Sequence, residues 1–386
     1  MLSRSSFEVH PLPRIVFAVG ASRRLAELLE PLGARSVLIV TDPGVVAAGL
    51  VAPMASALSE AGLAVEVFAG VEANPTDRNV TAGAAILRRL GMPVVMALGG
   101  GSAMDAAKAI ALLGPNDGGL SDILFGTQPQ RPGATTVAVP TTAGTGSETN
   151  MFGVITDTGS GRKVYIGHPS VRPVITVLDP ELTLGLPRYP TATCGMDVLT
   201  HAIEALTAVG ATPYCDSVAL GAIAMVAEWL PRAVADGSDI EARSQMLLAS
   251  SMAAIAFNVA GLGACHGTGH PLSARLHAAH GQTLATMLPH VMAFNADVCA
   301  AKYARVASAL GASGEGDDSA RAQAAIDAVR RLRAEVGVDR SIRALGGSPE
   351  MIEQLAADAM ADMITFTNPK PVSLEQVVLL YEQAMD

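Results

Sequence analysis

The chain has 386 residues, half of them hydrophobic, and a formal net charge of −10. This length exceeds one typical core, so we expect two domains. The acidic balance, without any block of Lys or Arg, argues against nucleic acid or an anionic membrane as partner. No uninterrupted apolar run reaches the ~18 residues that span a bilayer, and residues 1–13 lack the features of a signal peptide. Four cysteines without CxxC spacing favour a reduced, cytoplasmic protein.

Short β-branched runs alternate with helical patterns in the first half of the chain. Strands alternating with helices imply a mostly parallel sheet that is covered on both faces. Residues 158–161, Thr-Gly-Ser-Gly, lie between two such runs and predict a hairpin. The expected strands are residues 14–20, 36–42, 64–68, 94–98, 136–139, 151–157, 163–167 and 174–178, and helix-like segments include 22–31 and 76–90.

The pattern changes near residue 186. Long Ala/Leu/Met-rich helical patterns follow at 196–208, 215–229 and 241–257 and continue to Tyr381. Such patterns indicate an all-helical domain. We therefore predict an α/β domain over residues 1–186 and an all-α domain over residues 187–386.

Histidines gather near two short motifs of the second half. Asp197 and His201 are four residues apart in a helical pattern, so they share one helix face. His266 and His270 repeat this spacing, and His280 follows ten residues later. One carboxylate with several imidazoles is a ligand set for a divalent metal such as Fe(II) or Zn(II).

Spacing alone leaves other ligands open. Glu204 shares the helix face of Asp197 and His201, and His277 lies three residues before His280. Cys194 and Cys265 lie near these residues and are either thiolate ligands or small buried hydrophobes.

Two glycine-containing segments follow predicted strands. The first, residues 99–102, opens a helix, where glycines allow close approach and free N–H groups face a pyrophosphate. The second, residues 139–148, adds hydroxyls and two further glycines. Loops at the carboxyl ends of parallel strands flank one crevice, so both are expected to bind a nucleotide cofactor. A tight turn with nothing bound is the alternative. The expected contacts are Gly99, Gly100, Gly101, Ser102, Asp105, Thr141, Thr142, Thr145 and Ser147.

Asp42 ends the second predicted strand. A carboxylate there accepts hydrogen bonds from ribose hydroxyls and repels a 2′-phosphate, which favours NAD over NADP. The sequence Asp42–Pro43–Gly44 equally fits a helix N-cap or a turn. The acid precedes Gly99, so the order differs from the dinucleotide fingerprint in which the glycine loop comes first.

Together these motifs resemble the iron-containing (group III) alcohol dehydrogenases, whose fold is dehydroquinate synthase-like. The resemblance covers most of the chain. Its motifs are Phe-Ala-Val-Gly at 17–20, Val-Thr-Asp at 40–42, Gly-Gly-Gly-Ser-x-x-Asp-x-x-Lys at 99–108, Pro-Thr-Thr-Ala-Gly-Thr-Gly-Ser-Glu at 140–148, Asp-Pro-Glu-Leu-Thr at 179–183, Gly-Met-Asp-x-Leu-Thr-His-Ala-x-Glu at 195–204, His-x-x-x-His-Pro-Leu at 266–272 and His-Gly at 280–281.

The resemblance implies roles for these residues. It implies metal ligation by Asp197, His201, His266 and His280, and it places His270 near the substrate and nicotinamide. Lys163 matches a lysine near the cofactor ribose. The first domain is then the dinucleotide-binding domain and the second the metal-binding, catalytic one.

The expected activity is interconversion of a small alcohol and its aldehyde or ketone by hydride transfer with NAD(H), with His270 as the proton relay. A small-molecule alcohol or aldehyde is then the substrate, and a homodimer or larger homo-oligomer is expected. Alternatives are a reductase like the maleylacetate reductases, which residues 280–285 resemble, and an NAD-using lyase of the dehydroquinate synthase type.

Overall fold

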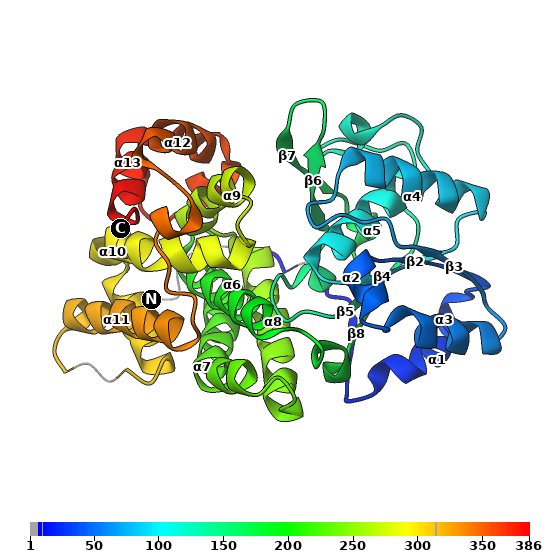
Figure 1. Cartoon of the computed structure of the whole chain (residues 1–386), viewed down its shortest axis with the longest axis horizontal. Helices are drawn as coiled ribbons and strands as arrows, with labels where there is room; N and C mark the ends of the chain where they lie inside the picture. Colours follow the sequence, from blue (N-terminus) through cyan, green and yellow to red (C-terminus); the bar gives the residue numbers. More distant parts are fainter. Residues whose placement is uncertain (1–6, 10, 313–314) are drawn as a thin grey trace. The chain divides into compact units, whose positions relative to one another are not determined.

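The structure is a computed structural model that describes residues 7–9, 11–312 and 315–386. It divides into two compact units (Figure 1). Residues 12–186 form an α/β unit, and residues 187–386 form a helical unit together with the described residues among the first eleven. The expected lack of a signal peptide concerns residues 1–13, of which 1–6 and 10 lie outside the described residues.

The α/β unit contains one six-stranded parallel sheet, as the alternating pattern predicts. Its spatial order is β1-β8-β5-β4-β2-β3, and every neighbouring pair is parallel. The central strands carry β-branched side chains, which suit a sheet that is buried on both faces. The strands are β1 (Arg14–Phe17), β2 (Ser36–Val40), β3 (Ala64–Phe68), β4 (Val94–Gly99), β5 (Thr136–Pro140) and β8 (Ile175–Leu178).

Helices cover both faces of this sheet. Leu38 and Val40 of β2 belong to the apolar cluster formed with α4 (Asp77–Arg89) and α5 (Gly101–Leu113). The intervening residues of the strand belong to the cluster on the opposite face, formed with α1 (Leu25–Leu29) and α3 (Val51–Glu60). Because successive side chains of a strand point to opposite faces, one sheet contributes to two apolar cores. A short helix, α2 (Pro43–Ala47), follows β2 directly.

The predicted hairpin is a separate two-stranded sheet. Strands β6 (Phe152–Asp157) and β7 (Arg162–Gly167) pair in antiparallel register, and β6 lies against α5. Gly153 makes this approach possible, because a Cβ atom there would lie 3.1 Å from the Cα atom of Asp105. The hairpin is therefore fixed to the helix that the glycine turn opens.

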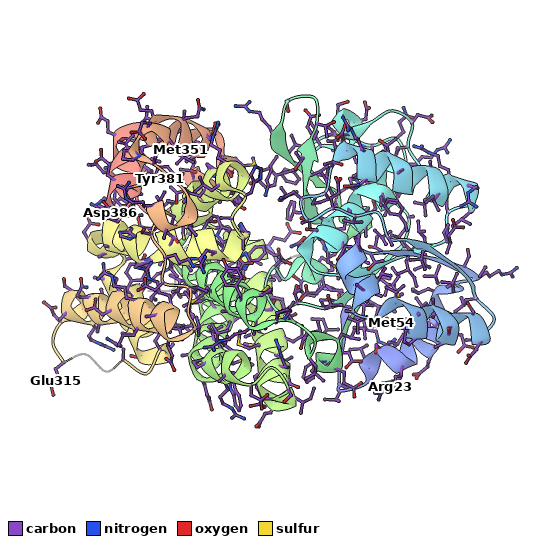
Figure 2. The ribbon with its side chains drawn as sticks, viewed as in Figure 1. Arg23, Met54, Glu315, Met351, Tyr381 and Asp386 are labelled. Carbon is purple, nitrogen blue, oxygen red and sulfur yellow. The ribbon has the colours of Figure 1, made fainter. Side chains whose placement is uncertain are left out.

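The helical unit is built around α6 (Arg188–Thr207), which is buried along almost its whole length. It packs against α7, α8 and α10, and α9 packs against α10. Tyr381 (Figure 2) fastens α9 to the C-terminal helix, because its buried hydroxyl donates to the carbonyl of Thr268 at 2.7 Å. The remaining helices are α7 (Pro213–Ala235), α8 (Ile240–Ala260), α9 (Ala264–Leu276), α10 (His280–Ala309), α11 (Asp318–Glu335), α12 (Ile352–Ala361) and α13 (Leu374–Gln383).

Helix α6 begins eight residues before the predicted start at residue 196. Pro190 lies in its first turn, where a missing N–H breaks no helical hydrogen bond. Gly195 lies inside the helix because α7 comes close: a Cβ atom there would lie 2.2 Å from Cδ1 of Leu230. Local sequence rules therefore placed the start of this helix too late.

Within the described residues, α7 and α10 are long and apolar enough to cross a membrane by length and composition alone. Helices α8 and α9 pass the same test only as a pair, and they are bent by 112° at the break between them. In the structure α7 packs on α6 and α8, and α10 packs on α6 and α11. Much of their apolar surface thus belongs to the core of the helical unit.

Candidate metal centre and cofactor loops

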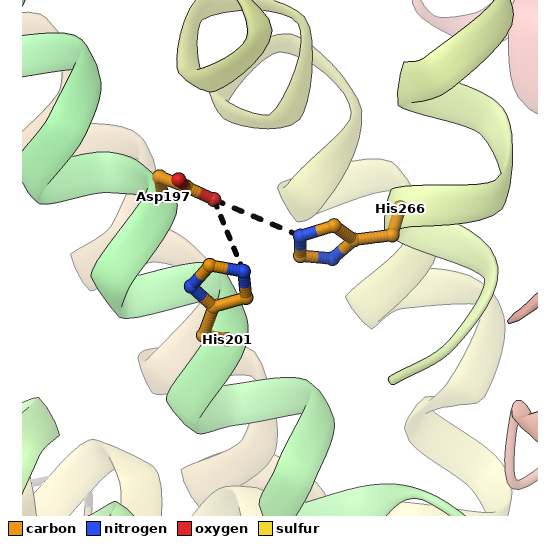
Figure 3. A group of neighbouring side chains, drawn as sticks. All are labelled: Asp197, His201 and His266. Carbon is orange, nitrogen blue, oxygen red and sulfur yellow. Dashed lines mark ion pairs between the residues drawn. The ribbon is translucent and has the colours of Figure 1, made fainter. Parts of the chain in front are cut away.

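Four predicted ligands converge in the helical unit. Asp197 and His201 lie one turn apart on α6, and α9 brings His266 to the same place (Figure 3). Oδ1 of Asp197 lies 3.4 Å from Nε2 of His201 and 3.6 Å from Nε2 of His266. His280, the first residue of α10, completes the group, with its Nε2 atom 3.7 Å from the same oxygen.

The group is buried on one side and open on the other. The side chains of Asp197, His201 and His266 are at most 6% exposed, whereas that of His280 is 32% exposed. A small ligand would therefore reach the group from the His280 side. The ligand atoms of the three buried residues lie within 4.8 Å of one another, which is a spacing that one metal ion can bridge.

The donor set fits a divalent metal. Within the described part of the chain, neither the buried Oδ1 atom of Asp197 nor the Nε2 atom of His266 makes a hydrogen bond. Buried polar atoms without partners are costly, and a cation between them would satisfy both. Burial would raise the pKa of the Asp197 carboxyl, but His201, His280 and His266 hold that pKa below its usual range. Asp197 is thus the anionic centre around which the imidazoles gather.

Glu204 orients one of these imidazoles. Its Oε2 atom lies 2.5 Å from Nδ1 of His266, and its Oε1 atom accepts the backbone N–H of Cys265 at 2.7 Å. Burial opposes a charged imidazole, yet Glu204 and Asp197 raise the pKa of His266 to about 9. A carboxylate on one ring nitrogen fixes the ring and leaves the other nitrogen for a metal. The geometry favours this supporting role for Glu204 over ligation.

His270 lies beside the group but outside the cluster of three. Its ring stacks on that of His280 at a centroid distance of 5.3 Å, and its Nδ1 atom lies 2.7 Å from Oδ2 of Asp362. The second carboxylate oxygen of Asp362 accepts the N–H of Ile364. Sequence reasoning missed Asp362, because 92 residues separate it from His270 and no local motif surrounds it.

The other candidate ligands lie elsewhere. His277 is exposed and caps α9 in the left-handed conformation, with φ of 51°. Burial raises the pKa of Cys194 to about 12 and that of Cys265 well above its usual value. Both thiols are free, and neither belongs to the described metal-binding cluster. Cys265 therefore fits the description of a small buried hydrophobe, and Cys194 that of a partly buried one.

The two predicted cofactor loops lie side by side in the α/β unit. They leave neighbouring parallel strands, and the N–H of Thr141 donates to the carbonyl of Gly99 at 3.0 Å. Gly99 has φ of 152° and Gly100 is the N-cap of α5. A Cβ atom on Gly101 would lie 2.7 Å from Cγ2 of Thr145, so only glycine allows this approach. The helix start and the threonine hydroxyls thereby face one small region.

Asp42 uses one carboxylate oxygen as a helix cap. Its Oδ1 atom accepts the N–H groups of Gly44 and Val45, at 2.8 and 3.0 Å. Its Oδ2 atom accepts no hydrogen bond from the described residues and lies 3.2 Å from where a Cβ of Gly99 would be. The two sequence interpretations are therefore compatible, since the cap leaves one oxygen beside the glycine turn.

The remaining predicted cofactor residues interact with other residues of the α/β unit. Ser102 donates to the carbonyl of Ala73 at 2.6 Å, and Ser147 donates to Asp105 at 2.7 Å. Lys163 lies on β7, and its charge acts on Asp105. Whether these side chains also touch the cofactor remains a prediction.

Known proteins agree with this description over nearly the whole chain. A family model described as "Iron-containing alcohol dehydrogenase" matches residues 13–180, and one described as "Fe-containing alcohol dehydrogenase family, C-terminal" matches residues 191–385. A probable alcohol dehydrogenase of Salmonella typhimurium, EutG, is 40% identical over 379 residues, covering 98% of this chain and 94% of the relative. An NAD-dependent methanol dehydrogenase of Bacillus methanolicus is 36% identical, covering 97% of this chain and 98% of the relative.

Solved structures show the same fold. The crystal structure of a 1,3-propanediol oxidoreductase superimposes with a TM-score of 0.95 at 35% identity, covering 99% of this chain and all of that chain. The parallel sheet, the helical second part and the cluster of Asp197, His201 and His266 that could hold a metal ion therefore occur together with the matching sequence motifs. The chain belongs to the iron-containing alcohol dehydrogenase family, whose members interconvert alcohols and aldehydes with a nicotinamide cofactor.

Proposed function

We propose that this alcohol dehydrogenase uses NAD(H), holds one divalent metal with Asp197, His201, His266 and His280, and acts on small uncharged alcohols and aldehydes. The observation that carries the proposal is the shared position of one carboxylate oxygen. Oδ1 of Asp197 lies within 3.7 Å of three imidazole Nε2 atoms. Iron(II) is the metal that the family implies, and zinc(II) suits the same donors.

The chain's own residues would hold and orient the reactants. Bound at these ligands, the metal supplies Lewis-acid polarisation of the alcohol or carbonyl oxygen, and the nicotinamide carries the hydride. Glu204 keeps the ring of His266 in place through Nδ1. The glycine turn at 99–102 and the hydroxyls of Thr141, Thr142 and Thr145 would bind the pyrophosphate. Asp42 would accept hydrogen bonds from the ribose through its Oδ2 atom.

His270 is the proposed proton relay. Asp362 engages its Nδ1 atom, so Nε2 remains to take or give the proton of the substrate hydroxyl. The ring lies against His280 and is therefore next to the proposed metal position. An imidazole there moves a proton without leaving the fixed geometry of the site.

Charge balance supports an uncharged substrate. The two buried carboxylates at the cluster, Asp197 and Glu204, would balance the two positive charges of the metal. A centre of zero net charge offers no surplus attraction for a substrate carboxylate, and burying an unpaired anion is costly. This argues against a dicarboxylate substrate of the maleylacetate type.

A matched substrate panel tests the proposal. Formation of NADH or NADPH is measured with 1-propanol, 1,3-propanediol and 3-hydroxypropionate, each with NAD and NADP, after loading with Fe(II) or Zn(II). We expect kcat/KM for the neutral alcohols to exceed that for the hydroxyacid by roughly 10²-fold, the scale of an unpaired buried charge. Equal or greater activity on the hydroxyacid would contradict the neutral-substrate assignment, and a lack of any net NADH formation would favour lyase chemistry.

We also propose that the enzyme works in the cytoplasm as a homodimer or larger homo-oligomer. All four cysteines are free thiols, which suits a reducing compartment. Among the described residues, strand β1 pairs only with β8. Phe17 at the end of this edge strand and Val19 just after it are 39% and 54% exposed. A second copy would cover such an edge. Light scattering on the purified chain would measure the assembly.

A further inference from the structure

The first turn of α9, the helix that carries His266, is capped by side chains from outside the helix. Its N-cap residue, Gly263, has no side chain, and the N–H of Gly267 is the one that donates to the carbonyl of this glycine. The N–H groups of the residues between these two glycines therefore need other acceptors. Two side chains that are distant in the sequence, Glu204 and Asn368, supply them.

These two side chains share the free N–H groups between them. Oε1 of Glu204 accepts the N–H of Cys265 at 2.7 Å and that of His266 at 3.4 Å, while its Oε2 atom holds the imidazole of His266. Oδ1 of Asn368 accepts the N–H of Ala264 at 3.2 Å. A Cβ atom on the N-cap glycine would lie 3.0 Å from the Glu204 oxygen and 3.1 Å from the Asn368 oxygen. The glycine therefore leaves room for both acceptors.

A second amide fixes which atom of Asn368 faces α9. The side-chain amides of Asn368 and of Asn295 on α10 exchange hydrogen bonds at 2.8 and 2.9 Å, and both residues are at most 4% exposed. Asn368 also donates to the carbonyl of Lys370 at 2.7 Å. Since both of its donors are used in this way, its oxygen is directed at Ala264. The amide pair thus joins α9 to α10, the helix that begins at the proposed ligand His280.

The segment from Asp362 to Asn368 follows α9 at steps of three residues. Asp362 lies 2.7 Å from the imidazole of His270. Thr365 lies so close to Gly267 that a Cβ atom there would overlap its hydroxyl. Asn368 then reaches the helix start. Much of the segment is a 3₁₀ helix, in which side chains three residues apart share one face. One face of the segment therefore follows α9 from the proposed proton relay to the capped first turn.

We infer that Asn368 is a positioning residue for the metal centre and that it acts by fixing the start of α9. The inference rests on the proposed metal site. A buried N–H without an acceptor is costly, so the loss of Asn368 would favour an unwound first turn. His266 lies in that turn, two residues after Ala264, and its ring would lose its fixed direction. Partners that orient a ligand typically change metal affinity by roughly 10- to 100-fold when they are removed.

The test compares two substitutions in the full chain that break the same amide pair. Asn368→Leu keeps the shape of the side chain and removes the cap. We expect the Kd for Zn(II), measured by competition with a chromophoric chelator, to rise by at least about tenfold. The visible absorption of bound Co(II) should also change, because it reports the geometry of the ligands.

Asn295→Leu is the matched control. In this variant Asn368 still donates to Lys370 and still accepts the N–H of Ala264, so the Zn(II) affinity should stay close to that of the unmodified chain. Equal loss of affinity in the two variants would assign the effect to general destabilisation and overturn the inference. Unchanged affinity in folded Asn368→Leu overturns it as well.

A double substitution covers loss of folding. If Asn368→Leu does not fold because Asn295 is left buried without its partner, Asn295→Leu together with Asn368→Leu removes both amides. Replacing both partners of a buried pair by apolar groups of similar shape is nearly neutral, so this variant should fold yet bind Zn(II) weakly. Full affinity in the folded double variant contradicts the inference. Failure of the unmodified chain to bind Zn(II) overturns the proposed metal site itself, so the two failures are distinguished.

Discussion

The metal centre and the cofactor loops use buried polar groups in opposite ways. At the metal centre, Asp197 and His266 turn side-chain atoms toward a common point and leave them without hydrogen bonds. At the loops, Lys108, Asp105 and Ser147 bond to one another. The start of α5 and the side chains of Thr142 and Thr145 lie close together beside this network, where we propose that the pyrophosphate binds. A small cation takes side-chain ligands, whereas a pyrophosphate is bound well by backbone N–H groups. The polar network at the loops therefore supports the residues that are proposed to bind the cofactor. The polar group at the metal centre is itself the proposed binding site.

The largest effect is expected from a substitution that removes one of the proposed metal ligands. His266→Ala should lose most bound metal and lower kcat by at least about 10³-fold, because the Lewis acid is lost, while the fold is kept. Elemental analysis measures the bound metal, and circular dichroism checks the fold. His277→Ala removes an exposed imidazole at the C-cap of the same helix and should keep metal and activity. Full metal occupancy in His266→Ala would show that the four ligands are wrongly assigned.

The next prediction separates ligand from proton relay. His270→Ala should retain the metal and bind NADH, while kcat falls by about 10²-fold, the scale of a lost general acid–base group. Metal content, NADH titration and single-turnover rates measure the three effects. Loss of metal as complete as in His266→Ala would make His270 a ligand. Full kcat with bound metal would move the proton transfer to water or the ribose.

Substitutions of Asp42 test the proposed cofactor site at the loops. Asp42→Gly should improve kcat/KM for NADP relative to NAD by on the order of tenfold, because a carboxylate repels a 2′-phosphate. Loss of the α2 cap should also cost a few tenths of a kcal/mol. Asp42→Asn is the sharper variant, since its amide oxygen can still cap α2 while the charge is gone. A cofactor ratio that stays constant in both variants would leave Asp42 as a cap alone.

The smallest expected effect concerns the stability of the loop network. Burial raises the pKa of Glu148 from 4.5 to about 7, against the charge of Lys108. Between these pH values Glu148 is more protonated in the folded state than in the unfolded state, so its contribution to the free energy of unfolding should fall as pH rises from 4.5 to 7. Glu148→Gln should lessen this fall by on the order of 1 kcal/mol in urea unfolding. Parallel curves for the two proteins over this range would contradict the prediction.

Local sequence determined much of the fold and the proposed members of both sites. Runs such as Ser36–Val40 are β-branched and short, and they became strands at the predicted places. A glycine turn between strand and helix was readable at 99–102 because both its geometry and its neighbours are local. Asp197 and His201 share a face of α6 by periodicity alone.

Only the tertiary structure brought the supporting partners together. Glu204 meets His266 across 62 residues, Asp362 meets His270 across 92, and Lys108 meets Ser147 across 39. Periodicity relates residues within one helix or strand, whereas these contacts depend on how separate elements pack. A side chain that orients a ligand needs only a carboxylate or an amine at the right distance, and many positions in the sequence could supply one. The sequence by itself therefore determined the elements and the proposed ligands, and packing decided which buried charges hold them in place.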